Sequence, residues 1–249
     1  MMRFLKSEGH EFNRWTCAYA ARGGRVRTLK WLRNQKPQCA WGVDTTVAAV
    51  QSGNVEVLKW LRSQNPPCPW TWETNMEAAG IGDLAMLKWL KEKECPWSTR
   101  SITAAARNGH LEVLEWLKQE GCPWSSTACA SAAYAGNIEI LKWLRSQSPP
   151  CPWNSKTCYE AAYAGHLSIL QWARSQNPPC QWDRLKCLAI AKNSNHNHIV
   201  AWIESQQSSL SGDGGDDLVH SQPEQSLISR AEGLKERLKD RSPDASQEK

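Results

Sequence analysis

The sequence predicts an all-α solenoid, a row of short helix pairs that stack on one another. Three observations lead to this prediction: two columns of tryptophan, a column of turn-forming glycines, and apolar residues at helical spacing. A helix pair of this size cannot bury its apolar side without neighbours, so the copies must stack. We therefore expect about seven stacked helix pairs over residues 1–205.

Tryptophan marks the repeat, because thirteen of the fifteen tryptophans fall into two columns. The first column, mostly in Lys-Trp-Leu triplets spaced 27 to 30 residues apart, is Trp31, Trp60, Trp89, Trp116, Trp143, Trp172 and Trp202. The second column, mostly in Cys-Pro-Trp, is Trp41, Trp70, Trp97, Trp124, Trp153 and Trp182. Each indole can bury about 150–250 Å², so we expect both columns to pack between neighbouring units.

Each unit reads as two helices joined by a glycine turn. We expect the first helix to begin at an N-cap residue (Thr16, Thr45, Thr74, Ser101 or Thr157) and to run through a pair of alanines. Seven residues before each first-column tryptophan stands a glycine, replaced in the last unit by Asn195, which tolerates a left-handed backbone. The second helix carries an apolar set at helical spacing, such as Val57, Leu58 and Leu61. The following stretch contains proline in most units and must be extended; some units lengthen it by two residues.

The two ends of the chain differ from the repeats. FLKSEGHEF at 4–12 matches WLKQEGCPW at 116–124, so residues 1–12 form a leading half-repeat. This half-repeat either caps the row, or the sequence is a fragment and the upstream part of the repeat is missing. We favour the fragment. Residues 206–249 are expected to form a disordered, acidic linker and tail, in which 224–240 could form a short amphipathic helix. That helix would cap the last unit, pair with a partner or remain disordered.

The repeats resemble ankyrin repeats. VLEWLKQEGCPWS at 113–125 aligns without gaps to the second helix and exit of an ankyrin repeat, and AARNGHLEVL at 105–114 resembles its turn. The resemblance covers residues 4–205 and is closest to the divergent Cys-Pro-Trp ankyrin arrays of algae, oomycetes and large DNA viruses. The connection from Trp124 to Ala132 is about six residues shorter than the ankyrin unit provides, so we expect shortened or absent β-fingers.

The ten cysteines are expected to pack as free thiols. Neighbouring units lie about 8–10 Å apart, too far for a disulfide between equivalent positions. No C-x2-C pair offers a zinc site, although metal binding and redox sensing remain alternatives. His110 and His166, beside the turn glycines, are expected to be structural, and His196 and His198 to be solvated.

The sequence favours a protein-binding scaffold or adaptor. No nucleophile elbow, P-loop or dinucleotide fingerprint is present, so we expect neither an enzyme nor a cofactor. No apolar run approaches the roughly 18 residues that a membrane span needs. We expect the protein to be a monomer. We expect it in the cytoplasm, with the nucleus as alternative, because thiols stay reduced in both compartments.

The resemblance assigns partner binding to the concave face of the first helices, at the slots that vary between repeats. These are Tyr19, Arg22, Gln51, Glu77, Arg107, Ser131, Tyr134, Glu160 and Tyr163. The alternative function is association with nucleic acid through the basic N-terminal units, because residues 1–36 hold nine basic and two acidic side chains.

Overall fold

A computed structural model of the chain describes residues 11–208, which form fourteen α-helices and no strand. The first helices of the seven units are α2 (Arg14–Arg22), α4 (Val43–Gln51), α6 (Trp72–Ile81), α8 (Thr99–Asn108), α10 (Ser126–Tyr134), α12 (Ser155–Ala164) and α14 (Arg184–Asn193). The second helices are α3 (Val26–Arg33), α5 (Val55–Arg62), α7 (Leu84–Glu92), α9 (Leu111–Gln119), α11 (Ile138–Ser146), α13 (Leu167–Ser175) and α15 (Asn197–Ser208). The predicted solenoid without β-fingers is confirmed for these residues. Most of the leading half-repeat and of the tail, including 224–240, lies outside them.

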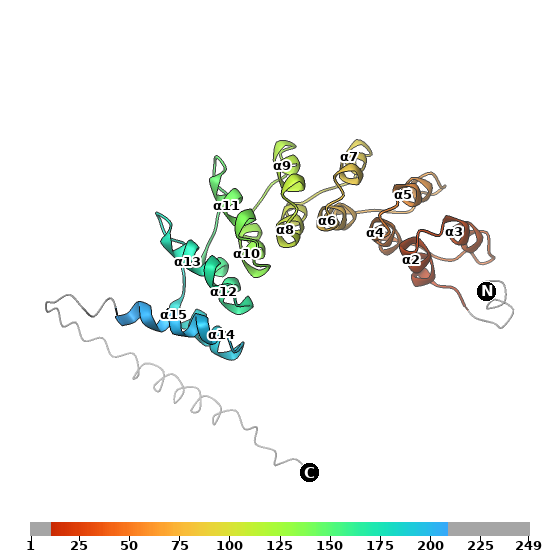
Figure 1. Cartoon of the computed structure of the whole chain (residues 1–249). Coiled ribbons are helices and arrows are strands. Elements are labelled where there is room, and N and C mark those ends of the chain that lie inside the picture. The colour runs from red at the N-terminus through yellow and green to blue at the C-terminus, as the bar shows by residue number, and fades with distance from the viewer. Residues whose placement is uncertain (1–10, 209–249) are drawn as a thin grey trace, which may run out of the picture. The chain divides into compact units, whose positions relative to one another are not determined.

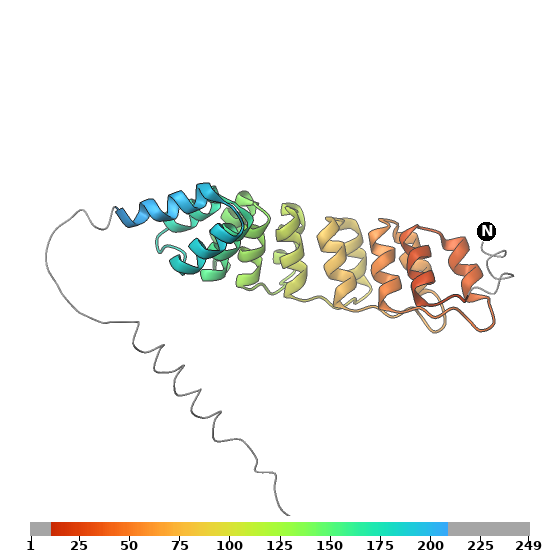
Figure 2. The same cartoon turned by 90° about the horizontal axis from the view of Figure 1, so that it is seen from below.

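The helix pairs of this array follow one another in a curved row (Figure 1). Each first helix packs on the next, α2 on α4 and so on to α14. The first helices line the inner side of the curve and the second helices the outer side. Figure 2 shows the helices standing beside one another across the row. The inner side is therefore made of the first helices, whose exposed positions are not used for stacking.

Small residues allow the first helices to approach closely. Six units have a pair of alanines in the first helix. The second alanine of each pair has no exposed surface: Ala21, Ala49, Ala79, Ala106, Ala133 and Ala162. All six turn glycines adopt positive φ angles between 65° and 86°, and Asn195 takes the same conformation at 59°. The predicted turn column is confirmed, including the asparagine in the seventh unit.

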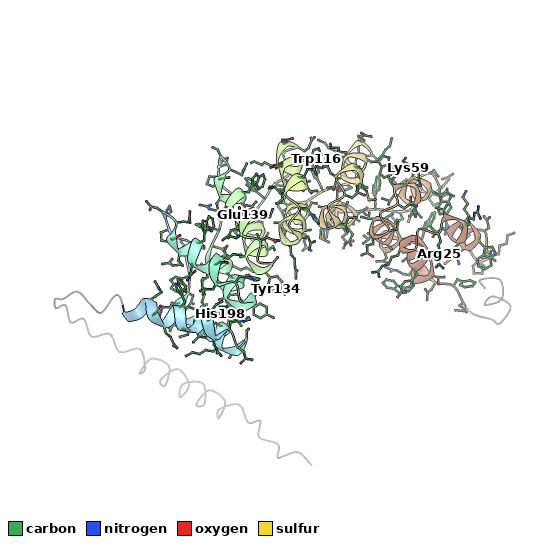
Figure 3. The ribbon with its side chains drawn as sticks, viewed as in Figure 1. Arg25, Lys59, Trp116, Tyr134, Glu139 and His198 are labelled. Carbon is green, nitrogen blue, oxygen red and sulfur yellow. The ribbon has the colours of Figure 1, made fainter. Side chains whose placement is uncertain are left out.

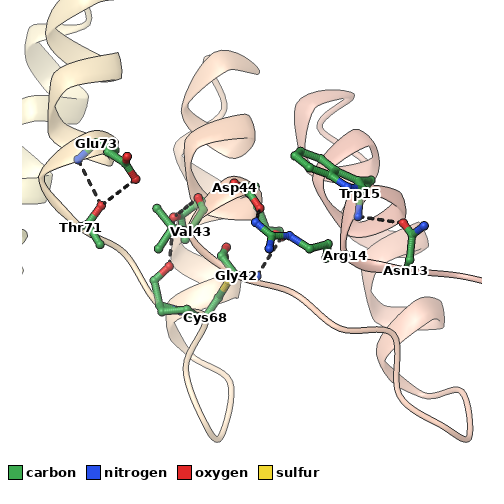
Figure 4. A network of polar contacts seen from close by, with 12 residues as sticks. Asn13, Arg14, Trp15, Gly42, Val43, Asp44, Cys68, Thr71 and Glu73 are labelled. Carbon is green, nitrogen blue, oxygen red and sulfur yellow. Dashed lines mark hydrogen bonds and ion pairs between the residues drawn. The ribbon is translucent and has the colours of Figure 1, made fainter. Parts of the chain in front are cut away.

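The predicted starts of the first helices were wrong by three residues. Each N-cap is the residue directly after a second-column aromatic ring, namely Asn13, Gly42, Thr71, Ser98, Ser125, Asn154 or Asp183. In α2 the Asn13 side chain accepts from Trp15 N at 3.0 Å, while Thr16 accepts from Asn13 N at 3.2 Å (Figure 4). The predicted caps thus occupy the third helical position, where a hydroxyl completes a capping box or is buried.

The tryptophan columns join neighbouring units. Each second-column ring packs against the first-column ring of the next unit, as Trp70 does on Trp89 with centroids 6.0 Å apart and planes at 77°. Phe12 opens the series by packing on Trp31 at 5.5 Å. All the column tryptophans are partly buried and pack against the apolar core. The prediction that indoles connect the units is confirmed.

A cation lies over each second-column ring, and its identity follows the length of the exit. In the four long exits an arginine covers the ring and donates Nη1 to the carbonyl of the following cysteine, as Arg145 does to Cys151 at 2.6 Å. The equivalent arginines are Arg33, Arg62 and Arg174. In the two short exits a lysine takes this place, and the chain turns through left-handed Glu94 or Gly121. The two additional residues of the long exit thus accompany an arginine cap.

All ten cysteines are free and buried. Burial raises the pKa of Cys68 to about 12, as expected for a packed thiol. Three pairs of cysteines, each 22 residues apart within one unit, interact with each other, which the spacing between units does not predict. Cys17 donates to Cys39 with their sulfurs 3.1 Å apart, which raises the pKa of Cys17 and lowers that of Cys39. In the pairs Cys129–Cys151 and Cys158–Cys180 the neighbouring thiol likewise raises the pKa of the first cysteine and lowers that of the second.

Histidine after the turn connects consecutive units. Nε2 of His110 donates to Gly80 O at 3.0 Å, and Nε2 of His166 donates to Tyr134 O at 3.1 Å. The structural prediction for these two is confirmed. His196 and His198 were expected to be solvated, but both donate to backbone carbonyls of the sixth unit, at 2.9 and 3.0 Å. They continue the same inter-unit contact.

Candidate functional site

The nine predicted partner-binding residues all belong to first helices, on the inner side of the row. Figure 3 labels Tyr134 on this side, whereas Lys59 and Trp116 lie on the outer side. The nine side chains do not form one surface patch. They divide into two groups, each over three consecutive first helices.

The first group surrounds a groove of about 340 Å³ over α8, α10 and α12, here called the Tyr134 groove. Its lining is Arg107, Thr127, Ala130, Ser131, Tyr134, Lys156 and Glu160. The Tyr134 ring stacks on Tyr163 at 6.0 Å and 19°, and the Arg107 guanidinium lies 4.7 Å from the Tyr134 ring centre. These three residues occupy the same slot in successive units, so helix stacking brings them into a continuous aromatic and cationic shelf.

The polar groups of the Tyr134 groove have both charges. Lys156 Nζ lies 4.0 Å from Glu160 Oε1, with the lysine side chain 60% exposed. Tyr163 is 44% exposed beside them. Such a surface can hold a peptide by stacking, by hydrogen bonds to hydroxyls, and by ion pairs with acidic or basic side chains of the peptide.

The second group lines a groove of about 410 Å³ over α2, α4 and α6, here called the Trp15 groove. Its lining is Trp15, Ala18, Tyr19, Arg22, Asp44, Val47, Ala48, Gln51, Glu73 and Met76. Glu77, the remaining predicted residue, contacts this group because Gln51 Nε2 donates to its Oε1 at 2.9 Å. An ion pair between Arg14 and Asp44 crosses from α2 to α4 at the same side (Figure 4).

Sequence reasoning missed several side chains of these grooves. Trp15, in the Trp15 groove, is 53% exposed. Leu185, on α14 and outside both grooves, was missed as well and is 71% exposed. Trp15 is outside both tryptophan columns and lies four residues before Tyr19, one helical turn away, which is a signal that could have identified it. Lys156 of the Tyr134 groove gave no such signal, because a single lysine at a helix start is common on solvated surfaces.

Within residues 11–208 no three His, Cys, Asp or Glu side chains gather as a metal site would require. In the same part of the chain, no helix has the length and apolar character to cross a membrane.

Comparison with known families agrees with the geometry of the array. Residues 102–145, which hold most of α8 and all of α9, α10 and nearly all of α11, match the family model described as ankyrin repeats (many copies). This segment of the chain is similar to ankyrin repeats. The matched ankyrin segment contains Arg107, Ser131 and Tyr134, so the Tyr134 groove lies partly within it. A search of curated proteins finds no match to the sequence.

Proposed function

We propose that this protein is a non-enzymatic scaffold or adaptor that binds a protein partner through the inner face of its first helices. Ankyrin repeats are protein-interaction modules, which supports the general role. The distribution of exposed apolar side chains supports the face. Of the six large apolar side chains most exposed in residues 11–206, five belong to first helices: Trp15, Tyr19, Ile81, Tyr163 and Leu185.

The observation that carries the proposal is the shelf formed by Arg107, Tyr134 and Tyr163. The indole columns already connect the units on the outer side, so the array does not need this shelf for stacking. Tyrosine and arginine are the residue types that contribute most at protein interfaces. The Trp15 groove offers a second aromatic surface on the same face, so we infer that the partner is an extended or elongated protein surface.

The experiment replaces the shelf while keeping the helices. In a Tyr134→Ala/Tyr163→Ala double variant, we expect capture of the partner from a lysate of the source cells to be lost. Helicity should stay close to wild type, because both tyrosines are partly exposed and neither belongs to the buried core. A matched control removes Leu111, a 38% exposed apolar residue on the second helix α9, and should keep the partner. Equal recovery of the same proteins by both variants refutes the assignment.

The alternative is nucleic-acid association through the basic N-terminal units. Residues 12–43 contain seven basic and no acidic side chains. Arg14 is paired with Asp44, and Arg33 lies on Trp41 at 3.9 Å, so Arg22, Arg25 and Lys30 are among those left to contact phosphate. Salt-sensitive retention of the full chain on a single-stranded DNA column, lost on reversing those charges, would favour this alternative.

We also propose that the array belongs to the Cys-Pro-Trp subtype and acts as a monomer in the cytoplasm or nucleus. The recurrence of the cysteine and tryptophan columns supports the subtype, and ten free buried thiols support a reducing compartment. Sedimentation at increasing concentration tests the monomer, and a fluorescent fusion tests the compartment.

A further inference from the structure

The outer side of the array repeats one arrangement at every boundary between units. A second-column indole lies under a cation, the next first-column indole packs against it, and a third position follows that indole by four residues. We call each boundary a junction and name it by its two indoles. At the Trp70–Trp89 junction this arrangement surrounds an open surface cavity of about 450 Å³. Its lining is Lys59, Arg62, Trp70, Trp89 and Lys93.

The neighbouring Trp97–Trp116 junction shows which group fits such a place. Lys91 Nζ lies 5.2 Å from the centre of the Trp97 ring. Glu120, four residues after Trp116, forms an ion pair with Lys91. The chain thus supplies its own carboxylate to the cation that lies over the indole.

At the Trp70–Trp89 junction the equivalent position has the opposite charge. The Arg62 guanidinium lies 4.1 Å from the Trp70 ring centre, and Nη1 donates to a backbone carbonyl. Lys93 stands where the next junction has Glu120, and neither Arg62 nor Lys93 has a carboxylate partner among the described residues. Lys59 is the third cation and is shared with Glu56 at 2.7 Å.

No other junction has a cation at this position. The residue four after the first-column indole is glutamine at four of the remaining junctions (Gln64, Gln147, Gln176 and Gln206) and glutamate at the fifth. In the first three, the glutamine amide donates to the indole residue's own carbonyl. The two indoles meet with centroids 5.9 to 6.4 Å apart at every junction, so the distance between them does not account for the lysine.

We propose that the Trp70–Trp89 junction binds an aspartate or glutamate carboxylate from an acidic segment of a protein partner. The incoming carboxylate takes the place that Glu120 fills at the next junction. Arg62 is suited to it, because a guanidinium on an aromatic ring still offers paired N–H donors to a carboxylate. The half-buried indoles lower the local dielectric and strengthen the ion pair. This site lies on the outer side, apart from the two grooves of the inner face.

The test measures binding of a fluorescein-labelled octa-glutamate peptide to the full chain by fluorescence anisotropy at low ionic strength. Lys93→Glu restores an internal carboxylate for Arg62 and should weaken binding about tenfold or more. Lys36→Glu makes the same change in net charge at an exit that does not line this cavity, and should leave the affinity within about twofold. Glu120→Lys exposes Lys91 at the next junction and should add a second bound peptide per chain.

Several outcomes overturn the proposal. If Lys93→Glu and Lys36→Glu weaken binding equally, or if wild type does not bind, the junction has no specific role. If a single-stranded octa-thymidylate binds more tightly than the peptide and shows the same dependence on Lys93, the site recognises phosphate rather than an acidic protein segment. Tyr134→Ala/Tyr163→Ala should not affect the peptide, which separates this test from that of the inner face.

Discussion

Adding one methyl group at Gly136 tests how the turns of consecutive units interlock. Gly136 has a φ angle of 79°, and a Cβ there would lie 2.7 Å from Cε1 of His166 in the next unit. That ring is held by its hydrogen bond to Tyr134 O. Gly53 is the matched control, because its φ of 65° is similar but a Cβ would meet no atom within 4 Å.

The two substitutions to alanine should differ in cost. Both place a side chain in the left-handed region, which costs about 1–2 kcal/mol in unfolding free energy. At Gly53 that is the whole cost. At Gly136 the His166 ring must move as well, which loses a hydrogen bond of about 1 kcal/mol and disturbs local packing. We therefore expect about 2–4 kcal/mol for Gly136→Ala.

A double-mutant cycle in urea, followed by circular dichroism, isolates the contact. His166→Ala alone should cost about 1 kcal/mol by losing the hydrogen bond to Tyr134 O. In Gly136→Ala/His166→Ala the clash no longer exists, so the double variant should cost about 1 kcal/mol less than the sum of the single variants. Strict additivity, or equal costs for Gly53→Ala and Gly136→Ala, would show that the contact with the His166 ring does not explain why glycine is needed at position 136.

Two further predictions concern the cysteines and the arginine caps. Burial raises the pKa of Cys68 and of Cys95 from 9.0 to about 12. Above pH ~9 the unfolded chain therefore loses protons that the folded chain keeps, and the free energy of unfolding should fall by about 1.4 kcal/mol per pH unit for each thiol up to pH ~12. The dependence of the unfolding temperature on pH should be less steep in Cys68→Ala/Cys95→Ala than in wild type. An unchanged slope would contradict the assignment. Arg145→Ala removes the stack on Trp153 and the bond to Cys151 O, and should cost about 1–3 kcal/mol in urea unfolding. Arg145→Lys should recover part of that loss, as the lysines of the short exits suggest; no recovery would mean that the carbonyl bond alone matters.

Much of the fold could be predicted because a repeat places the same residue type in the same environment many times. The turn glycines, the alanine pairs and the indole columns each recur in register, so the noise of a single copy averages out. The helix starts could not be placed this way, because hydroxyl residues are favoured both at the N-cap and at the third helical position. The decisive pattern was the polar residue or glycine directly after each second-column aromatic ring, such as Asn13 and Thr71.

The candidate sites were less predictable, since they depend on contacts between units. The sequence indicated the helices that hold Tyr134 and Tyr163, but the stack between them requires the spacing of α10 and α12. The thiol contact of Cys17 with Cys39 spans 22 residues and belongs to no local spacing rule. In each case the sequence gives the side chain, and stacking of the helices determines its neighbour.

Departures from the repeat are most informative where packing stays constant. Trp70 and Trp89 meet at 6.0 Å, and Trp97 and Trp116 meet at 6.2 Å, so the contact between the two indoles is alike at both junctions. Four residues after its second indole, the first junction has Lys93. The next junction has Glu120 at that position, and Glu120 forms an ion pair with Lys91 of the same chain. Because Lys93 is exposed and the indole geometry is unaffected, the folding of the array does not require this difference in charge. A change of charge that folding does not require is a place to look for recognition of a partner. Here the lysine in place of glutamate leaves the Arg62 guanidinium available to a carboxylate from another molecule.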